Sequence, residues 1–222
     1  MGTRTIDQLE TEARQRADME SDDSFITSAE AFRMINQSIK ELYDLLIENQ
    51  GHEYYITTQS ISTVAGTSSY ALNSAFYQLL GVDATVGSTV FTVRPFMFQE
   101  RNAYSLGAGW GGLEPVYYRV EGSNIVFIPA PMAVHSVTVW YIPQFTDLTT
   151  GQTFDGINGW EEYVVVDVAM KMLEKEESDT SHLMTRKALL TERIKALASR
   201  RDAGSPSRVV DVIGTNLVYG DE

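Results

Sequence analysis

The sequence predicts an α+β fold in which helices at both ends of the chain pack together, with a small antiparallel β module inserted between them and an extended C-terminal arm. Apolar residues recur at helical spacing near both ends, whereas the middle of the chain consists of short β-branched and aromatic runs separated by glycine and proline. We therefore predict N-terminal helices in 1–52, the β module in 53–146, C-terminal helices that complete the helical part in 147–200 and an extended arm in 201–222.

Size and composition fit a globular protein. The chain has 222 residues, of which 43% are apolar, and no cysteine, so it can bury a sizeable core without disulfides. No apolar run approaches the roughly 20 residues that span a bilayer, and the first residues lack the apolar core of a secretory signal. The composition therefore predicts a soluble, intracellular protein.

Two helices are predicted in the N-terminal region, joined by an acidic link at 20–24. The first places Ile6, Leu9 and Ala13 on one face. The second carries a longer apolar stripe, which consists of Phe32, Ile35, Ile39, Leu42 and Leu46.

Local signals mark both ends of the longer helix. Thr27 and Glu30 have the spacing of a capping box, in which each side chain accepts from the other residue's backbone N–H. We predict the end of the helix at Asn49-Gln50-Gly51, because glycine adopts the left-handed conformation that closes a helix.

The β module is predicted to consist of short strands bounded by glycine or proline. These strands cover 54–58, 70–72, 79–83, 89–94, 117–121, 125–128 and 137–142. The clearest hairpin spans 117–128, where Gly122-Ser123 fits a type II′ turn. Its register places Val120 opposite Ile125 and Tyr118 opposite Phe127, and a second predicted hairpin joins 79–83 to 89–94.

Residues 158–200 predict two further helices. The first begins at a cap formed by Asn158 and Glu161, and burial must override the poor helix propensity of its valines 164–166. Its stripe consists of Trp160, Val164, Val168 and Met172. The polar stretch 178–181 then caps a fourth helix. Its predicted stripe consists of Leu183, Leu190, Ile194 and Leu197.

The arm begins where Gly204-Ser205-Pro206 interrupts the fourth helix. The run Val209–Ile213 has the β-branched content of a strand, and such a segment can add to a sheet edge of another chain. A plain disordered tail is the competing interpretation.

Charge limits the partners of the protein. The chain has 17 basic and 30 acidic residues and a net charge of −13, whereas gripping duplex DNA requires clustered Lys and Arg. The acidity is explained either by solubility or by a surface that lets nucleic acid pass without sticking.

No residue pattern in the sequence indicates catalysis, cofactor binding or metal binding. His52, His135 and His182 lie in three different regions and lack the spacing of metal ligands. The glycine cluster 107–112 is followed by a proline and a strand instead of the helix N-terminus that a phosphate loop needs, so we predict a flexible loop. Glu161-Glu162 occupy a first helical turn, where acids favour the helix dipole. We predict no catalytic, cofactor-binding or metal-binding residue.

Several segments taken together resemble one family, in their order and spacing along nearly the whole chain. They are PFMFQERNAY at 95–104, YYRVEGSNIVFIPAP at 117–131, VTVWYIPQF at 137–145 and GINGWEEYVVVDVAMKMLEKEESD at 156–179. They are similar to segments of the head-to-tail adaptor (connector) proteins of tailed bacteriophages.

The resemblance implies a structural virion protein without enzymatic activity or cofactor, made in the host cytoplasm and placed at the head-to-tail interface. Such adaptors form a ring, commonly of about twelve copies, beneath the portal protein. The ring extends the DNA channel, through which genomic DNA passes without specific binding, and it docks a tail or nozzle protein. No membrane is involved.

Two other classes remain open. A helix-flanked β module could bind a ligand or carbohydrate, and the side chains that could line a sugar site are Trp110, Tyr117, Tyr118, Trp140 and Tyr141. Strand alternation would place about half of them in the core. A hydrolase would instead require two carboxylates of separated pKa in one cleft.

Overall fold

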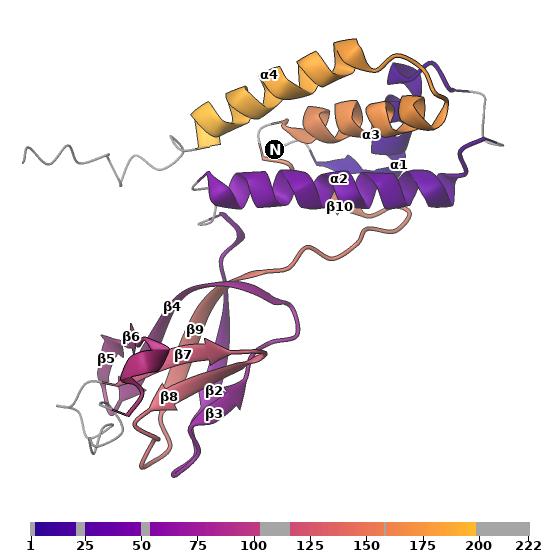
Figure 1. The fold of residues 1–222 in the computed structure, drawn as a ribbon. Helices are drawn as coiled ribbons and strands as arrows, with labels where there is room; N and C mark the ends of the chain where they lie inside the picture. The colour runs from indigo at the N-terminus through magenta and orange to yellow at the C-terminus, as the bar shows by residue number, and fades with distance from the viewer. Residues whose placement is uncertain (1–2, 21–24, 50–53, 103–115, 158, 199–222) are drawn as a thin grey trace, which may run out of the picture.

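The computed structural model describes residues 3–20, 25–49, 54–102, 116–157 and 159–198. Within these ranges four helices form one part of the molecule, and a β module lies beside them, joined by two chain segments (Figure 1). The expected α+β class is therefore confirmed. The extended arm that we predict for 201–222 lies outside the described residues.

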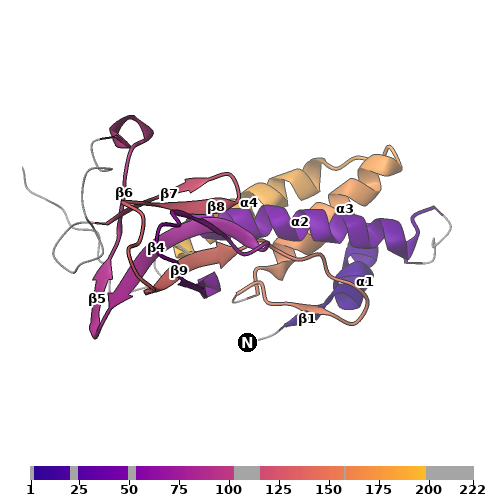
Figure 2. The same ribbon diagram turned by 90° about the horizontal axis from the view of Figure 1, so that it is seen from below.

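The helical part is built from both ends of the chain. Helices α1 (Ile6–Arg16) and α2 (Ser28–Glu48) come from the N-terminal region, and α3 (Glu161–Lys175) and α4 (Ser181–Ala198) come from the C-terminal region. Helix α3 packs against the other three helices. In the view of Figure 2, α1 and β1 lie on one side of α2, whereas α3 and α4 lie on its other side. The N-terminal and C-terminal helices thus share one core.

The predicted helical stripes fill this core. Ile6, Leu9 and Ala13 are fully buried in α1, and the valines 164–166 of α3 are buried as well. Burial therefore does override helix propensity at the valines, as expected. Two predicted stripe positions differ, because Phe32 is only partly buried and Leu197 is 40% exposed.

Each helix start has its own cap. Thr5 and Gln8 form a reciprocal capping box at α1, which the sequence reasoning missed. At α2, Thr27 accepts from the Glu30 N–H at 3.3 Å, but the Glu30 carboxylate accepts from Lys175 of α3 at 2.7 Å. The predicted capping box is therefore only half formed, because an ion pair between helices engages Glu30.

The start of α3 also differs from the prediction. Trp160 occupies its N-cap position and makes no side-chain cap bond, while the predicted cap residue Asn158 lies outside the described residues. Helix α2 has Asn49 as its C-cap, and the predicted stop signal Gln50-Gly51 falls outside the described residues too.

Helices α1 and α3 end in the same motif with an unusual residue. In each, the N–H groups of the two residues after the C-cap bond back to carbonyls of the last turn, a Schellman motif. The left-handed position holds Asp18 in α1 (φ 58°) and Glu177 in α3 (φ 63°), where glycine is usual.

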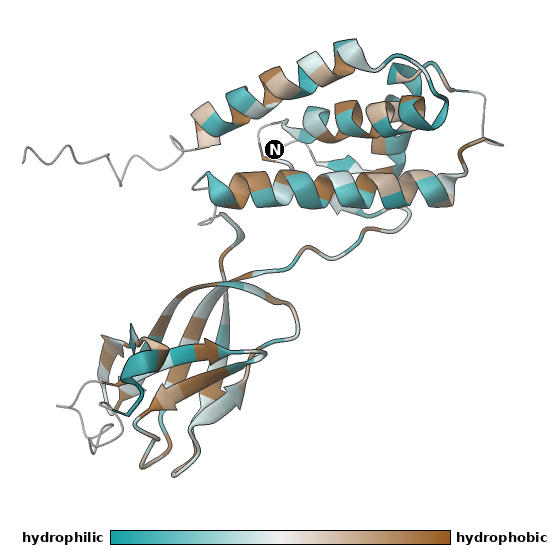
Figure 3. Cartoon of the chain, in the orientation of Figure 1, coloured by the Kyte–Doolittle hydropathy of each residue, from teal (hydrophilic) through white to brown (hydrophobic). Residues whose placement is uncertain are grey.

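The β module contains two four-stranded sheets. One has the order β2 (Thr57–Ser62), β9 (Ser136–Pro143), β4 (Phe76–Val86) and β5 (Thr89–Thr92). The other has the order β3 (Ser69–Ala71), β8 (Asn124–Ile128), β7 (Tyr117–Glu121) and β6 (Arg94–Pro95), and a short 3-10 helix, η2 (Phe98–Glu100), follows β6. Their facing side chains form a core separate from that of the helices, so apolar residues occur in both parts (Figure 3).

Both predicted hairpins are present, but β4 continues to Val86 and pairs with β5 mostly beyond the predicted strand 79–83. In β7–β8, Val120 is opposite Ile125 and Tyr118 is opposite Phe127, and Gly122 has the positive φ (59°) that the turn requires. In β4–β5, the pairing runs from Asp83–Thr92 to Val86–Thr89.

Three details of the strand prediction are wrong. The strand predicted at 54–58 begins at Thr57, because Tyr54 and Tyr55 form a 3-10 turn. Strand β6 pairs with β7 in parallel, so the module is not wholly antiparallel. The sequence also gives no sign of the short pair of β1 (Arg4–Thr5) and β10 (Thr153–Phe154), which joins the segment before α1 to the segment before α3.

The end of strand β9 connects the two parts. Val137, Val139 and Tyr141 are buried while Trp140 is exposed, as strand alternation requires. Alternation then fails at Ile142, which is fully buried because it packs with Tyr43 and Ile47 of α2. Helix α2 therefore belongs to the helical core on one face and contacts the β module with the other.

Candidate functional site

The two histidines in the described residues lie apart. His182 is exposed at the start of α4, His135 is partly buried before β9, and His52 lies outside the described residues. Within the described ranges, no three side chains of His, Asp or Glu converge as metal ligands. The glycine cluster 107–112 falls outside these ranges.

Of the aromatic residues considered for sugar binding, Trp140 and Tyr141 lie on opposite faces of strand β9. Tyr141 is buried in the sheet, whereas Trp140 is 39% exposed and donates from its indole N–H to Asp83 at 2.8 Å. Tyr117 and Tyr118 are partly buried in β7, and Trp110 lies outside the described residues. Trp140 and Tyr141 therefore do not form a common stacking platform.

The paired carboxylates at the start of α3 have structural contacts. Glu161 is buried and accepts from the Gly156 N–H at 3.1 Å, and a Cβ at Gly156 would come within 2.9 Å of the Glu161 side chain. Glu162 forms an ion pair with Arg16 of α1 at 2.9 Å. Asp22 and Asp23, in the predicted acidic link, lie outside the described residues.

An ion network built around the buried Asp167 joins three helices. Asp167 of α3, whose side chain is 4% exposed, accepts from Lys187 of α4 at 2.6 Å, from Lys171 of α3 at 2.7 Å and from the Ser38 hydroxyl of α2. Both lysines also contact Glu41, at 3.2 and 3.3 Å. The sequence did hint at this network, because Asp167 interrupts the apolar run 163–170 and Lys187 occupies the gap in the predicted stripe of α4.

The charge states of Asp167 and Lys187 suit a structural ion pair and not an acid catalyst. Burial alone would raise the pKa of Asp167, but hydrogen bonds from Lys171, Lys187 and Ser38 outweigh it and hold that pKa below its ordinary value. Burial likewise opposes the charge of Lys187, but its hydrogen bond to Asp167 raises the Lys187 pKa above its ordinary value. A general acid needs a raised carboxyl pKa, so Asp167 stabilises helix packing instead.

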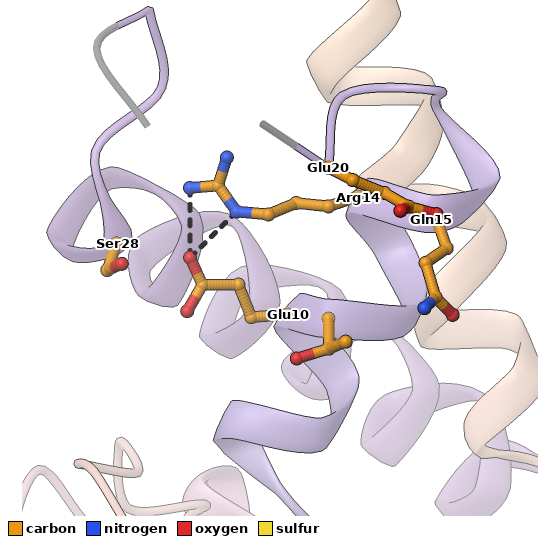
Figure 4. Close-up of a pocket in the computed structure, with 6 residues that line it drawn as sticks. Glu10, Arg14, Gln15, Glu20 and Ser28 are labelled. Atoms are coloured by element: carbon orange, nitrogen blue, oxygen red, sulfur yellow. Dashed lines mark hydrogen bonds and ion pairs between the residues drawn. The ribbon is translucent and has the colours of Figure 1, made fainter. Parts of the chain in front are cut away.

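A polar cavity of about 360 Å³ lies at the end of α1 (Figure 4). Its most basic group, Arg14, is already bound: the guanidinium donates to Glu10 at 2.9 Å and to the Ile26 carbonyl at 2.6 Å. The other lining residues are Thr11, Gln15, Glu20 and Ser28. With Arg14 neutralised by Glu10, this cavity offers no net positive charge to an anionic ligand.

A second cavity, of about 240 Å³, lies where α2 meets the β module, lined by Lys40, Tyr43, Asp44, Tyr77, Gln144 and Phe145. Tyr43 donates to the Pro143 carbonyl at 2.7 Å, and Tyr77 donates to Asp44 at 2.8 Å. Burial and the charge of Asp44 raise the pKa of Tyr43 to about 12, so it remains a neutral donor at neutral pH. These bonds tie the base of the sheet to α2.

Two apolar groups are exposed on the β module. Met97 is 71% exposed beside Phe98, whose ring carries the guanidinium groups of Arg101 and Arg119 at 4.3 and 4.6 Å. The other group consists of Val64, Met132 and Val134, each more than half exposed. Exposed apolar groups of this kind are typical of surfaces that bind other proteins.

The loops that carry the second group are firmly held. The Thr63 N–H donates to the His135 carbonyl, and the Thr63 hydroxyl donates to Ala133 and accepts from the His135 N–H at 2.8–3.0 Å. Gly66 donates to the Pro131 carbonyl at 2.7 Å. Val64, Met132 and Val134 are therefore presented on a rigid surface.

The comparisons with known proteins place the whole described fold in one family. The family model SU10 adaptor protein matches residues 4–210, which includes both the helices and the β module. No curated protein sequence matches the chain. No helix in the described parts of the chain has the length and hydropathy to cross a membrane.

Proposed function

The chain belongs to the SU10 adaptor protein family and is therefore a structural phage adaptor, and from that premise we propose that copies of it form a ring beneath the portal protein. The ring extends the DNA channel and docks a tail or nozzle protein at the head-to-tail interface of the virion. The match over residues 4–210 carries this proposal, because it spans every described helix and strand.

The architecture supports a scaffold. The ion network around Asp167 links the helices of the helical core. The β module has its own core, and the hydrogen bonds of Tyr43 and Tyr77 connect it to α2. The helical part and the β module, which meet at α2, hold their outer surfaces at fixed relative positions, as a docking surface requires. We assign the docking of tail proteins to the exposed apolar groups around Phe98 and around Met132 on the β module.

The charge supports passage of DNA. A net charge of −13 on each copy is multiplied in a ring, so carboxylates facing the channel repel phosphate at short range. At physiological salt this repulsion extends only about 8 Å, which is enough to keep DNA from adhering to the wall.

Binding to a portal ring tests the proposal directly. Purified full-length protein is mixed with the portal ring of the same phage, and the complex is examined by sedimentation and by negative-stain imaging. We expect a second ring stacked on the portal, with an extended channel. A portal ring that sediments without the protein at micromolar concentrations would refute the proposed function.

A further inference from the structure

Helix α4 carries two apolar stripes, and only one of them is covered. Leu183, Leu190, Ile194 and Ala198 face the helical core, with Lys187 at the remaining position of this inner stripe. A second stripe runs one residue earlier along the chain, at the same helical spacing. This outer stripe consists of His182, Arg186, Leu189, Arg193 and Leu197, and all five are exposed.

The outer stripe sets α4 apart from the other helices. Its Leu189 is 62% exposed and its Leu197 is 40% exposed, whereas α1, α2 and α3 expose no large apolar side chain among the described residues. In addition, α4 contains four basic residues and one acidic residue, while acidic residues outnumber basic ones in each of the other three helices. Among the described helices, α4 alone therefore has a surface that is both apolar and basic.

The arginines of the outer stripe are available for a partner. Neither Arg186 nor Arg193 has an ion pair or side-chain hydrogen bond in the described structure, although the protein has an excess of carboxylates. Helix α4 lies at the outside of the helical part, against α3 and α2 (Figure 1). Its outer stripe can therefore be reached by another molecule.

The same hairpin offers the complementary charge at its other end. Four exposed carboxylates lie in and beside the turn between α3 and α4, and we name them the acidic turn: Glu174, Glu176, Glu177 and Asp179. Lys175, the basic residue among them, is already paired with Glu30 at 2.7 Å. Helix α4 has 18 residues and is about 27 Å long, so Arg193 lies far from the acidic turn of its own chain.

We propose that the outer stripe of α4 in one copy docks against the acidic turn of a second copy, head to tail. Arg186 and Arg193 pair with carboxylates of the turn, and Leu189 and Leu197 are buried beside them. A second copy fits this surface better than a nucleic acid does, because leucines alternate with the arginines and residues 1–180 contain 25 acidic against 10 basic residues.

The inference rests on the proposed function for its geometry. Different surfaces of each copy meet in a head-to-tail contact, and repetition of such a contact closes a ring when the rotation between neighbouring copies adds up to a full turn. Two antiparallel copies of α4 would also pair opposite charges, but they would stop at a dimer. The size of the assembly therefore distinguishes the two arrangements.

Charge exchange on the full-length chain tests the contact. The stripe variant is Arg186→Glu with Arg193→Glu, and the turn variant is Glu176→Lys with Glu177→Lys. We expect each to raise the concentration needed for assembly, measured by sedimentation velocity, by about tenfold or more. The variant that combines all four substitutions restores opposite charges and is expected to assemble within about threefold of the wild type.

Mixing the two defective variants gives an independent readout. In a 1:1 mixture each altered stripe faces an altered turn and each native stripe faces a native turn, so alternating copies are expected to assemble. The matched control is Arg33→Glu with Arg94→Glu, which makes the same charge change at two exposed arginines away from both surfaces and should leave assembly unchanged. Since all four exchanged side chains are exposed, thermal unfolding should confirm that every variant is folded.

The outcomes separate this contact from the proposed function. A wild type that remains monomeric at about 100 μM, a closed dimer, or a four-substitution variant as defective as its parents would overturn the inference. Loss of duplex DNA binding by the stripe variant without loss of assembly would overturn it in favour of a nucleic-acid surface. If portal rings bind the wild type and the stripe variant equally well, the result supports the proposed function and refutes the contact between α4 and the acidic turn. If assembly follows the charge exchange but portal rings do not bind the protein, the result supports the contact and refutes the proposed function.

Discussion

Lys187 of α4 donates to Asp167 of α3 at 2.6 Å, and this ion pair lies within the otherwise apolar interface between the two helices. Lys171 and Ser38 complete the contacts of Asp167, so one carboxylate links α2, α3 and α4. The pairing fixes how α4 lies on the bundle, because a lysine at this position of the inner stripe has to reach its partner.

The first prediction concerns removal of that carboxylate. Asp167→Asn keeps the shape of the side chain but leaves two lysines without their main partner, and we expect it to lower the free energy of unfolding by about 3 kcal/mol. Asp147→Asn is the matched control, because its pair with Lys40 is exposed and should contribute less than about 1 kcal/mol. Urea denaturation measures both. Equal losses from the two variants would show that the buried network contributes no more than a surface pair.

The second prediction concerns pH. The pKa of Asp167 is lowered in the folded state, so its contribution is present above the unfolded value of about 3.9 and is lost as the pH falls through the folded value. The pKa of Lys187 is raised, so its contribution is present below about 10.4 and is lost at higher pH. We expect the stability difference between wild type and Asp167→Asn to be constant between these limits and to shrink below about pH 4. A difference that persists undiminished at pH 2 would contradict the assignment.

The third prediction contrasts two helix starts. Thr27→Ala should cost about 0.5–2 kcal/mol through loss of the bond from the Glu30 N–H. Because the Glu30 carboxylate pairs with Lys175, Thr27→Ala and Glu30→Ala should be additive within about 0.5 kcal/mol. Thr5→Ala and Gln8→Ala act through one reciprocal capping box, so that pair should cost less together than the sum of the two. Denaturation of both double-mutant cycles distinguishes the two cases.

The fourth prediction concerns the left-handed residue after α3. Glu177 has a φ of 63°, a conformation that costs a residue with a side chain about 1–2 kcal/mol, and it adds a negative charge at the negative end of a helix. Glu177→Gly should therefore stabilise the protein, by about 1 kcal/mol in thermal or urea unfolding. Asp18→Gly should gain less, since Asp tolerates this conformation better. Destabilisation by Glu177→Gly would mean that its carboxylate has a contact worth more than the strain.

The fifth prediction concerns the chain beyond α4. A truncation that ends at Asp202 removes the β-branched run Val209–Ile213 but none of the described core, so it should unfold at the same urea concentration as the full chain. If the arm adds to a sheet edge of the portal protein, this truncation should bind portal rings more weakly in the sedimentation assay. Undiminished binding would assign the arm to a disordered tail.

Much of the fold follows from local patterns. The stripes of α2 and α3, the cap at Thr27 and the register of the β7–β8 hairpin depend on residues close in sequence, and apart from Phe32 each is found where the pattern predicts it. The β1–β10 pair depends on residues about 150 positions apart, for which no local pattern exists.

The errors have a common physical cause, which is contact between distant segments. Ile142 is buried against the alternation of its strand because α2 covers that side of the sheet. The Glu30 side chain leaves its capping box for Lys175 of α3. In α4 the hydrophobic pattern selects Leu197, although Ala198 is the buried residue at that end of the helix, and it passes over Lys187, which enters the interface with α3. Apolar character does not identify a residue that enters an interface through an ion pair.

The insertion of the β module between α2 and α3 also determines the order in which the chain can gain structure on a ribosome. Helices α1 and α2 are synthesised first, but the valines that cover them are added only after residues 49–160. At about 5–20 residues per second this delay is on the order of 10 s. The β module is contiguous in sequence and can complete its own core during that time, while the part of α2 that packs against α3 is still uncovered. A nascent chain of this protein therefore passes through a stage at which the α3-facing side of α2 is exposed to water, and it leaves that stage only when α3 emerges.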